Sequence, residues 1–453
     1  MASLFTDNAV LQRNQPVPVW GRAEPGATVT VEFAGQKKSA VTDSSSHWKI
    51  VLDPMPASFE PRELIVSSSG GTQQTKIKNV LIGEVWICSG QSNMQRGVYW
   101  SREVRALIPE AEHIRSFTVK QTVAFTGQDT CDGAWVDHHP DSAVAFSFAY
   151  FLEQAADVPV GIILTCWGSS SIEGWMPRDM TAALPHFAEQ MQAFDADAEK
   201  QARIKAALNG PSPWGKREDL LLRTQPNMLY NAMMHPLVPY ACRGLVWYQG
   251  ESNAVSIESM LQYGETLPLW VRRYRKAWQN DRMHFLVVML PGFGKLDRDV
   301  IDPEDPSLIS WAWMREAQLS VLDLPHTALA NTIDLGDLTN VHPRDKLPVG
   351  QRLALLAARD TLSLELEAQG PVMNAVQRKG DQLVVLFDHA KGLKTTDGAA
   401  PTAFWIADNS KVWKKAEAEI HGQSVVLRSP ELKEPLYVRY AFAAKPAVNL
   451  VNA

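Results

Sequence analysis

One serine in the chain has the local sequence of a nucleophile. Ser92 follows the apolar run 85–88 within Gly90-Gln91-Ser92-Asn93-Met94, and Gly90 permits a tight turn with positive φ. A hydroxyl at the start of a helix faces free N–H groups, which suit a developing oxyanion. The alternative is that Ser92 only caps the helix, because short motifs also match by chance. Met94 shows that this is not the G-x-S-x-G elbow.

A histidine late in the chain has the chemistry of the matching base. His342 closes the stretch 333–342, in which Asp334 and Asp337 precede it. An unperturbed imidazole, with a pKa of about 6.5, takes up and returns a proton near neutrality. Either aspartate is a candidate for the acid that orients the ring. The chain has 11 histidines, so His342 is singled out only by the residues around it.

Two further segments offer donors for an oxyanion. Gly168 follows the apolar run 160–164 and either presents its N–H or belongs to an ordinary turn. Gln249 and Asn253 follow the run 245–248, and either side chain can donate an N–H, although Asn253 is equally suited to a structural turn. A nucleophile, oxyanion donors and a base together are what acyl transfer requires.

These segments all follow predicted strands. From residue 81 to about 364, short apolar runs alternate with helical patterns, which predicts a mainly parallel α/β sheet with both faces covered. In such sheets the chemistry gathers at the carboxyl ends of the strands. The predicted strands are 84–88, 160–164, 245–248, 285–290 and 327–333, and the predicted helices are 144–156, 261–278, 311–322 and 349–362.

The two ends of the chain have a different pattern. Short alternating segments bounded by Gly and Pro indicate β modules before and after the α/β region. We therefore expect an N-terminal β-sandwich-like module over 1–80, a catalytic domain over 81–364 and a second β module over 365–453.

The composition bears on partners and cofactors. The 44 basic and 50 acidic residues give a net charge of −6, with no basic surface of the kind that binds nucleic acid. No apolar run is long enough for a membrane span. The four cysteines lack C-x-x-C spacing, and Asp137-His138-His139 lacks metalloprotease spacing, so we expect no metal and no cofactor. The first residues lack the pattern of a signal peptide. The oligomeric state stays open.

The motifs together resemble the sialate O-acetylesterase family within the SGNH hydrolases. The resemblance runs over nearly the whole chain, and its most specific parts are Gly-Gln-Ser-Asn-Met and Trp-Tyr-Gln-Gly-Glu-Ser-Asn. The matching stretches are 83–94, 167–168, 172–176, 229–231, 236–237, 247–253, 315–318, 334–337 and 342–343.

The resemblance implies a flavodoxin-like, three-layer core flanked by β modules, and a metal-free hydrolysis of acetyl esters on carbohydrates. It assigns Ser92 as nucleophile and His342 as base. The oxyanion hole would combine the Ser92 and Gly168 N–H groups with Gln249 or Asn253, of which Gln249 is slightly favoured. Asn93 and Glu251 would contact the substrate. Because family members are often exported, it also implies a periplasmic or secreted location.

One departure from the family pattern concerns the triad acid. SGNH enzymes usually place an aspartate three residues before the histidine, where this chain has Thr339, and the next position is Asn340. The orienting acid is then Asp337 or Asp334, or a carbonyl holds the ring in a Ser–His dyad. A dyad is workable because the acid only orients the ring and stabilises its charged form.

The sugar is less well defined than the reaction. Trp167 and Trp175 either stack on a sugar face or pack in the core. Arg315 either meets the carboxylate of a sialic acid or forms a structural ion pair. O-acetylated sialic acid is the first expectation, and acetylated xylan or xyloglucan is the alternative. A non-catalytic carbohydrate-binding protein is a further one.

Overall fold

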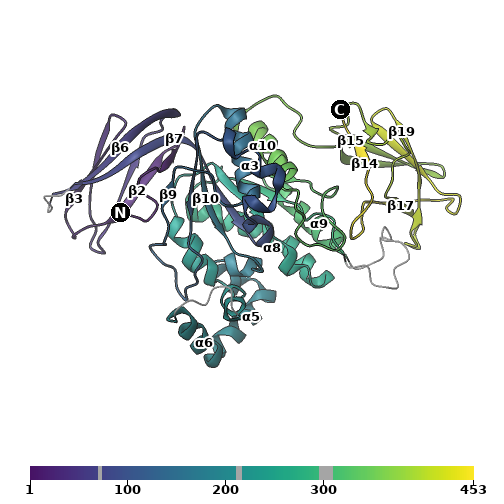
Figure 1. Ribbon diagram of the computed structural model, residues 1–453. Coiled ribbons are helices and arrows are strands. Elements are labelled where there is room, and N and C mark those ends of the chain that lie inside the picture. Colours follow the sequence, from purple (N-terminus) through teal and green to yellow (C-terminus); the bar gives the residue numbers. More distant parts are fainter. Residues whose placement is uncertain (70–73, 211–216, 295–309) are drawn as a thin grey trace.

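A large mixed α/β sheet forms the centre of the protein in a computed structural model that describes residues 1–69, 74–210, 217–294 and 310–453 (Figure 1). Its parallel strands follow the order β13-β12-β11-β7-β10-β8, and the short β9 (Trp135–Val136) adds an antiparallel edge. The parallel strands are β7 (Thr75–Gly90), β8 (Ile114–Thr118), β10 (Val160–Cys166), β11 (Gly244–Tyr248), β12 (His284–Val288) and β13 (Thr327–Ala330).

All five strands predicted for this region are present. The prediction for 327–333 was too long, because the strand ends at Ala330. Strand β8 was not predicted, since Arg115 and Ser116 interrupt its apolar run although both are buried. The predicted helices are also present, and the one over 311–322 ends at Gln318 and continues as a 3₁₀ turn over Leu319–Asp323.

Helices cover both faces of the sheet. Trp86 of β7 packs edge-on against Phe148, with ring centroids 5.3 Å apart, and Trp247 of β11 lies 4.6 Å from Trp270. Trp247 pairs with Ser89 of β7 and shares its face of the sheet. Ser89 lies three residues after Trp86, and because successive side chains of a strand point to opposite faces, Trp86 and Trp247 are on opposite faces. The helices of these two contacts therefore lie on opposite faces. The principal helices are α3 (Ala143–Ala156), α8 (Ile257–Trp278), α9 (Ala312–Gln318) and α10 (Leu347–Leu362), of which α3 packs with α10 and α8 with α9.

A group of helices between β10 and β11 was not predicted. These helices project away from the sheet at the bottom of the view in Figure 1. Their apolar stripes are narrow, and the longest helix buries only Phe187, Met191 and Phe194. The group contains α4 (Arg178–Ala183), α5 (Pro185–Ala196) and α6 (Ala198–Leu208).

The N-terminal β module shares a strand with the central sheet. The first half of β7 pairs with β6 (Ser58–Ser68) and β1 (Val10–Gln12), and its second half pairs with β10 and β11. One continuous buried cluster accordingly includes residues of both parts. The other strands of the module are β2 (Val17–Arg22), β3 (Thr28–Phe33), β4 (Gln36–Val41) and β5 (His47–Leu52).

The C-terminal β module has a separate core. Its buried cluster includes Leu383, Phe404 and Val425 and lies apart from the main one. The larger of its sheets has the order β14-β15-β20-β19 and another the order β18-β17-β21. The strands are β14 (Val372–Lys379), β15 (Gln382–Asp388), β16 (Lys394–Thr395), β17 (Phe404–Ala407), β18 (Lys414–Lys415), β19 (Glu417–His421), β20 (Ser424–Arg428), β21 (Tyr437–Tyr440) and β22 (Leu450–Val451).

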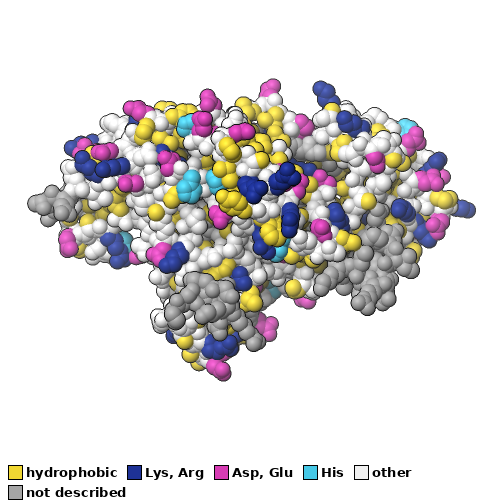
Figure 2. All heavy atoms as spheres, viewed as in Figure 1, with side chains coloured by type: hydrophobic (Ala, Val, Ile, Leu, Met, Phe, Trp, Pro, Cys, Tyr) yellow, Lys and Arg dark blue, Asp and Glu magenta, His cyan; other side chains and the backbone are white. Residues whose placement is uncertain are grey.

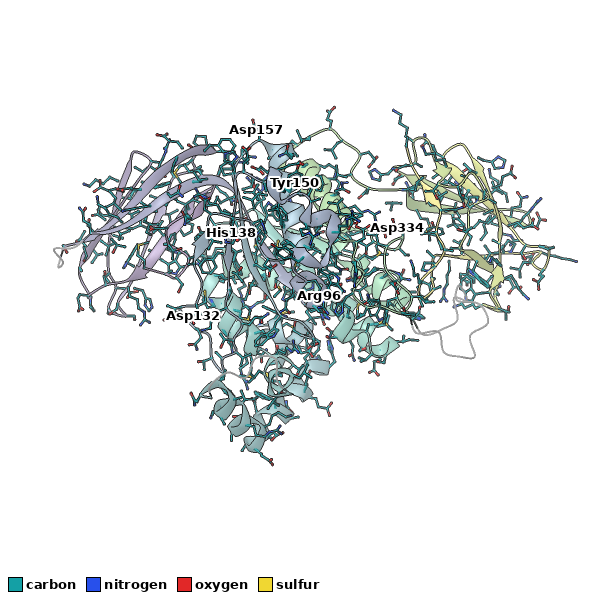
Figure 3. The ribbon with its side chains drawn as sticks, viewed as in Figure 1. Arg96, Asp132, His138, Tyr150, Asp157 and Asp334 are labelled. Atoms are coloured by element: carbon teal, nitrogen blue, oxygen red, sulfur yellow. The ribbon has the colours of Figure 1, made fainter. Side chains whose placement is uncertain are left out.

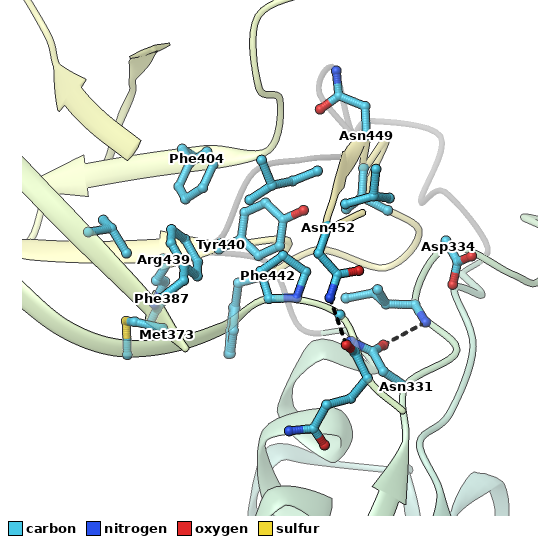
Figure 4. A pocket seen from close by; sticks show the side chains of 18 of the residues that line it. Asn331, Asp334, Met373, Phe387, Phe404, Arg439, Tyr440, Phe442, Asn449 and Asn452 are labelled. Carbon is cyan, nitrogen blue, oxygen red and sulfur yellow. Dashed lines mark hydrogen bonds between the residues drawn. The ribbon is translucent and has the colours of Figure 1, made fainter. Parts of the chain in front are cut away.

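A cavity of about 1040 Å³ separates this module from the α/β region. It is lined by aromatic and polar side chains from both parts, among them Tyr440, Phe442, Asn331 and Asp334 (Figure 4). The module is therefore only partly packed against the catalytic core.

The surface carries both charges. Lys and Arg side chains are interspersed with Asp and Glu over the face seen in Figure 2. Within the described ranges, no helix is long and apolar enough to cross a membrane.

Glu84 joins the N-terminal module to the sheet through buried ion pairs. Its fully buried carboxylate lies 2.7 Å from Arg13 and 2.9 Å from Arg243. Breaking a buried pair leaves uncompensated charge, so Glu84→Ala should lower the free energy of unfolding by about 3–5 kcal/mol in urea titrations. Glu60→Ala is the matched control, because its pair with Arg62 is exposed and should contribute about 1 kcal/mol or less. Equal shifts for the two variants would contradict the prediction.

Candidate active site

The register of three strands brings the predicted segments to one point. Gly90, at the end of β7, pairs with Cys166 on one side and Tyr248 on the other. Gly90 has φ +140°, and a Cβ at this position would lie 2.1 Å from the Tyr248 carbonyl oxygen. Only glycine allows this close approach. The turns that begin at residues 91, 167 and 249 therefore meet at the carboxyl edge of the sheet.

The nucleophile and base candidates are in hydrogen-bond contact. Ser92 is the first residue of α1 (Ser92–Gln95), and its Oγ lies 2.8 Å from His342 Nε2. The loop that carries His342 follows β13, and two amides hold it. Asn93 donates to the Val341 carbonyl at 3.0 Å, and Asn340 Oδ1 accepts the His342 N–H at 2.9 Å.

A buried polar cluster supports this contact. The Asn93 amide donates to Glu251 at 2.6 Å, and its oxygen accepts from Lys346 Nζ at 2.6 Å. Burial raises the pKa of Glu251 and lowers that of Lys346 to about 7. Asn93 is fully buried. Asn93 and Glu251 were expected to contact substrate, but in this structure they join the Ser92 turn to the His342 loop.

Two cations dominate the surroundings of His342. Arg96 Nη2 lies 3.2 Å from His342 Nδ1. Burial and the charges of Arg96 and Lys346 lower the pKa of His342 to about 4. The imidazole is therefore neutral at pH 7 and can take up a proton in a reaction.

Neither predicted acid bonds to His342. Asp337 is exposed and accepts from the N–H groups of Thr339 and Asn340 at 2.8 and 2.9 Å. These bonds lower the pKa of Asp337. Asp334 forms a bidentate ion pair with Arg352 of α10, at 2.7 and 2.6 Å. The expectation that one of them orients the ring is thus not met. Figure 3 shows Asp334 on the side of the C-terminal module, away from Arg96.

Gly168 lies beside the nucleophile. A Cβ at position 168 would be 3.2 Å from the Ser92 Cβ. The Gly168 N–H donates to Gln95 Oε1 at 2.6 Å, so an amide oxygen is the acceptor of this N–H. The Ser92 N–H opens α1, where the first N–H groups of a helix have no intrahelical acceptor.

Gln249 and Asn253 belong to a buried network. Gln249 Nε2 lies 2.8 Å from Asn253 Oδ1 and 3.2 Å from both Gln91 Oε1 and the Ser170 carbonyl. The Asn253 amide donates to Glu173 at 3.1 Å. An amide nitrogen has only two hydrogens. A role of either residue in the oxyanion hole would require these bonds to be exchanged.

Three residues expected to bind substrate are buried. Trp167 and Trp175 are 1% and 0% exposed, and Trp175 donates to Ser170 Oγ at 2.9 Å, so neither offers a face to a sugar. Arg315 is buried and donates to carbonyls of residues 441, 443 and 444. It anchors the C-terminal module and does not meet a substrate carboxylate.

The residues of the tentative metal motif also have other partners. Asp137 pairs with Arg115 at 3.1 Å, and the His138 carbonyl accepts from Ser116 Oγ at 3.0 Å. In the part of the chain that the structure describes, no three His, Cys, Asp or Glu side chains form a group that could hold a metal ion.

Sequence reasoning missed the charged residues of the site. Arg96 and Lys346 each stand four residues after a predicted catalytic residue, Ser92 and His342 respectively. One helical turn brings such positions together, so this spacing was an available signal for Arg96, which directly follows α1, but not for Lys346, which lies in the loop before α10. Arg223 was also missed. Its Nη1 lies 3.5 Å from the position of a Cβ on Gly168.

Comparisons with known proteins identify the class of enzyme. A family model described as "Carbohydrate esterase, sialic acid-specific acetylesterase" matches residues 184–358. Sialate O-acetylesterase of Mus musculus is 26% identical over 82% of this chain and 76% of its own length, and that of Homo sapiens is 28% identical over 78% and 69%. The crystal structure of a novel carbohydrate acetylesterase from Xanthomonas citri is 30% identical, with a TM-score of 0.83, over 100% of this chain and 96% of that one.

The fold, the site and these similarities define a carboxylic ester hydrolase that acts on O-acetyl esters of carbohydrates. The chain belongs to the sialate O-acetylesterase family of carbohydrate esterases. The alternative of a non-catalytic carbohydrate-binding protein does not agree with this membership.

The position of Asp337 leads to a prediction about the acid. If His342 is the base, His342→Ala should lower kcat/KM for acetate release at least about 10³-fold. Asp337→Asn keeps the oxygen that accepts the loop N–H groups and removes only the charge, so the loss should stay below about tenfold, the size of one hydrogen bond. Equal losses in the two variants, at unchanged thermal stability, would show that Asp337 is the third member of a triad.

Proposed function

We propose that the chain is a serine esterase that removes O-acetyl groups from sialic acids through an acetyl-enzyme on Ser92. The 2.8 Å contact between Ser92 Oγ and His342 Nε2 carries this proposal. It lies at the carboxyl edge of a parallel sheet, where α/β enzymes bind their ligands.

The proposed reaction has two half-reactions. Nε2 of His342 accepts the Ser92 proton while Oγ attacks the acetyl carbonyl, and the protonated imidazole then returns that proton to the departing sugar hydroxyl. Water, with His342 again as base, hydrolyses the acetyl-enzyme. His342 needs a free electron pair on Nε2 for both attacks, and hence its proton on Nδ1.

The oxyanion hole of the proposal consists of the Ser92 and Gly168 N–H groups. The Gln95 amide oxygen, 2.6 Å from the Gly168 nitrogen, supports this assignment because it is a neutral acceptor in the same place. The acetyl group has to displace Gln95 before the carbonyl can enter. Preorganised N–H donors of this kind are worth more to an oxyanion than to a neutral carbonyl.

The charges around the site favour an anionic sugar. Arg96, Arg223 and Lys346 come close to the Ser92 turn from three segments of the chain. A guanidinium is suited to binding a carboxylate. This supports a sialic acid, whose ring bears a carboxylate, over a neutral sugar.

Acetylated xylan or xyloglucan stays the second candidate substrate. It is favoured by the similar Xanthomonas citri structure, which is described as a carbohydrate acetylesterase without reference to sialic acid. Both candidate substrates need the same reaction at Ser92. Only the sialic acid also needs a cation in the site, to bind its carboxylate.

Finer structural assignments belong to the same proposal. We assign the layered core to the flavodoxin-like SGNH hydrolase fold, with the catalytic domain over 81–364 and β modules over 1–80 and 365–453. The periplasmic or secreted location inferred from the family resemblance stays a prediction.

The substrate is tested by acetate release from O-acetylated sialic acid and from acetylated xylo-oligosaccharides, using wild type and Ser92→Ala. We expect release mainly from the sialic acid, and none by the variant, because no other residue would carry the acetyl group. Release mainly from the xylo-oligosaccharides would keep the mechanism and change the substrate. Undiminished release by Ser92→Ala would overturn the mechanism.

The low pKa of His342 predicts the acid limb of the pH profile. The base must be unprotonated, and kcat/KM reports the pKa of the free enzyme. Because the pKa of His342 is about 4, kcat/KM should be insensitive to pH from neutrality to well below 6.5 and should fall only as the pH drops through about 4. Rates measured after brief exposure to each pH, with return to pH 7 as a control for unfolding, test this. An acid limb at the ordinary histidine value would contradict it.

A further inference from the structure

The contact between Arg96 and His342 determines where the imidazole carries its proton. A guanidinium has only N–H donors, so in the 3.2 Å contact Arg96 donates and His342 Nδ1 accepts. An accepting Nδ1 has no hydrogen, and a neutral imidazole then has its hydrogen on Nε2. The Nε2–H therefore donates to Ser92 Oγ across the 2.8 Å contact. In this tautomer Nε2 cannot accept the serine proton.

Protonation of the ring does not remove this difficulty. The charged groups that face His342 are Arg96, after α1, and Lys346, before α10, and both charges oppose an imidazolium. Glu251 is connected to Lys346 through Asn93, which donates to the carboxylate and accepts from the ammonium group. The site has a cation at Nδ1 where a triad has an anion. An active state requires Arg96 to leave Nδ1 and an acceptor to replace it.

No carboxylate of the described residues competes for Arg96. Among the described residues no acid forms an ion pair with it, and its Nε is buried without a hydrogen-bond partner. The guanidinium carbon lies 4.5 Å from the centre of the Trp100 ring, which balances part of its charge. Arg344 lies 5.3 Å from the same ring. This arrangement leaves Arg96 able to pair with an anion that enters the site.

We propose that a carboxylate on the substrate takes Arg96 away from His342 and accepts the Nδ1 hydrogen bond, so that the substrate supplies the acid that the chain lacks. The inference rests on the proposed function and goes beyond it. Arg96 is then a positioning residue that makes hydrolysis depend on an anionic sugar.

The step conserves protons. Nε2 releases one proton to water and Nδ1 takes one up from water, so the ring stays neutral and the carboxylate stays ionised. As the bond from Ser92 Oγ to the acetyl carbon forms, the Oγ proton moves to Nε2 and the carbonyl electron pair moves to oxygen. The carboxylate offsets the Arg96 charge, which removes one of the two charges that oppose the imidazolium.

Acetate release from a charged and a neutral form of one sugar tests the proposal. The pair is O-acetylated N-acetylneuraminic acid and its carboxyl methyl ester. Wild type should prefer the acid by about tenfold or more in kcat/KM, the usual size of such a coupling. Arg96→Met should lose this preference and hydrolyse the methyl ester faster than wild type does. Arg96→Lys keeps a positive charge but loses the paired N–H donors of the guanidinium, so it should retain part of the preference.

The gain on the neutral substrate separates this role from a structural one. A variant that only disturbed the site would lose activity on both sugars by the same factor, and that result would overturn the proposal. Equal rates of wild type on the two sugars would overturn it as well.

A second measurement uses wild type alone. In ¹⁵N spectra of the imidazole groups, the His342 signals are those absent from His342→Gln. The free enzyme should have Nε2 protonated and Nδ1 unprotonated. Added N-acetylneuraminic acid should move the proton to Nδ1, and its methyl ester should not. A free enzyme with the proton on Nδ1, or no response to the acid, would contradict the inference. Acetate release that survives Ser92→Ala would instead overturn the proposed function, whatever the tautomer.

Discussion

The close approach of Gly90 to Tyr248 is the constraint on which the site depends. A side chain at Gly90 would collide with the neighbouring strand, so the end of β7 can reach the register that aligns it with β10 and β11 only as glycine. That alignment brings Ser92 beside Gly168 and brings Gln249 beneath the same turn. Asn93 then connects the turn to the His342 loop. The catalytic distances thus follow from backbone pairing and one buried amide.

The electrostatics around His342 differ from those of a Ser-His-Asp triad. A triad surrounds its histidine with negative charge, which stabilises the imidazolium of the transition state. Here the nearest charges are positive, and both carboxylates of the preceding loop are held by other groups, Asp334 by Arg352 and Asp337 by backbone N–H groups. The free enzyme therefore keeps its base neutral over a wide pH range, and any anion that enters meets cations it can pair with.

Local pattern predicted the sheet well, because parallel strands are short apolar runs and their carboxyl ends share one edge. The contact between Ser92 and His342, 250 residues apart, follows from that rule. It was harder to predict which distant groups the charged and aromatic side chains near the site would contact. Arg315 belongs to a stretch that matches the family, yet its partners are carbonyls more than 120 residues later in the chain. Trp175 lies beside a strand end but turns into the core, where Ser170 satisfies its N–H. A local sequence pattern does not predict which distant group a charged or indole side chain will contact.

The strand β7 belongs to two sheets, and this limits how the chain can change over evolution. Its first half completes the N-terminal module, and its second half leads into the turn that carries Ser92. Deleting the module would leave half of a long strand with an open edge, which is prone to pair with other chains. The C-terminal module closes its own core, and none of its described strands pairs with the central sheet, although Arg315 donates to three of its carbonyls. Recombination can therefore exchange the C-terminal module as a unit, whereas the N-terminal one has to be inherited together with the active site.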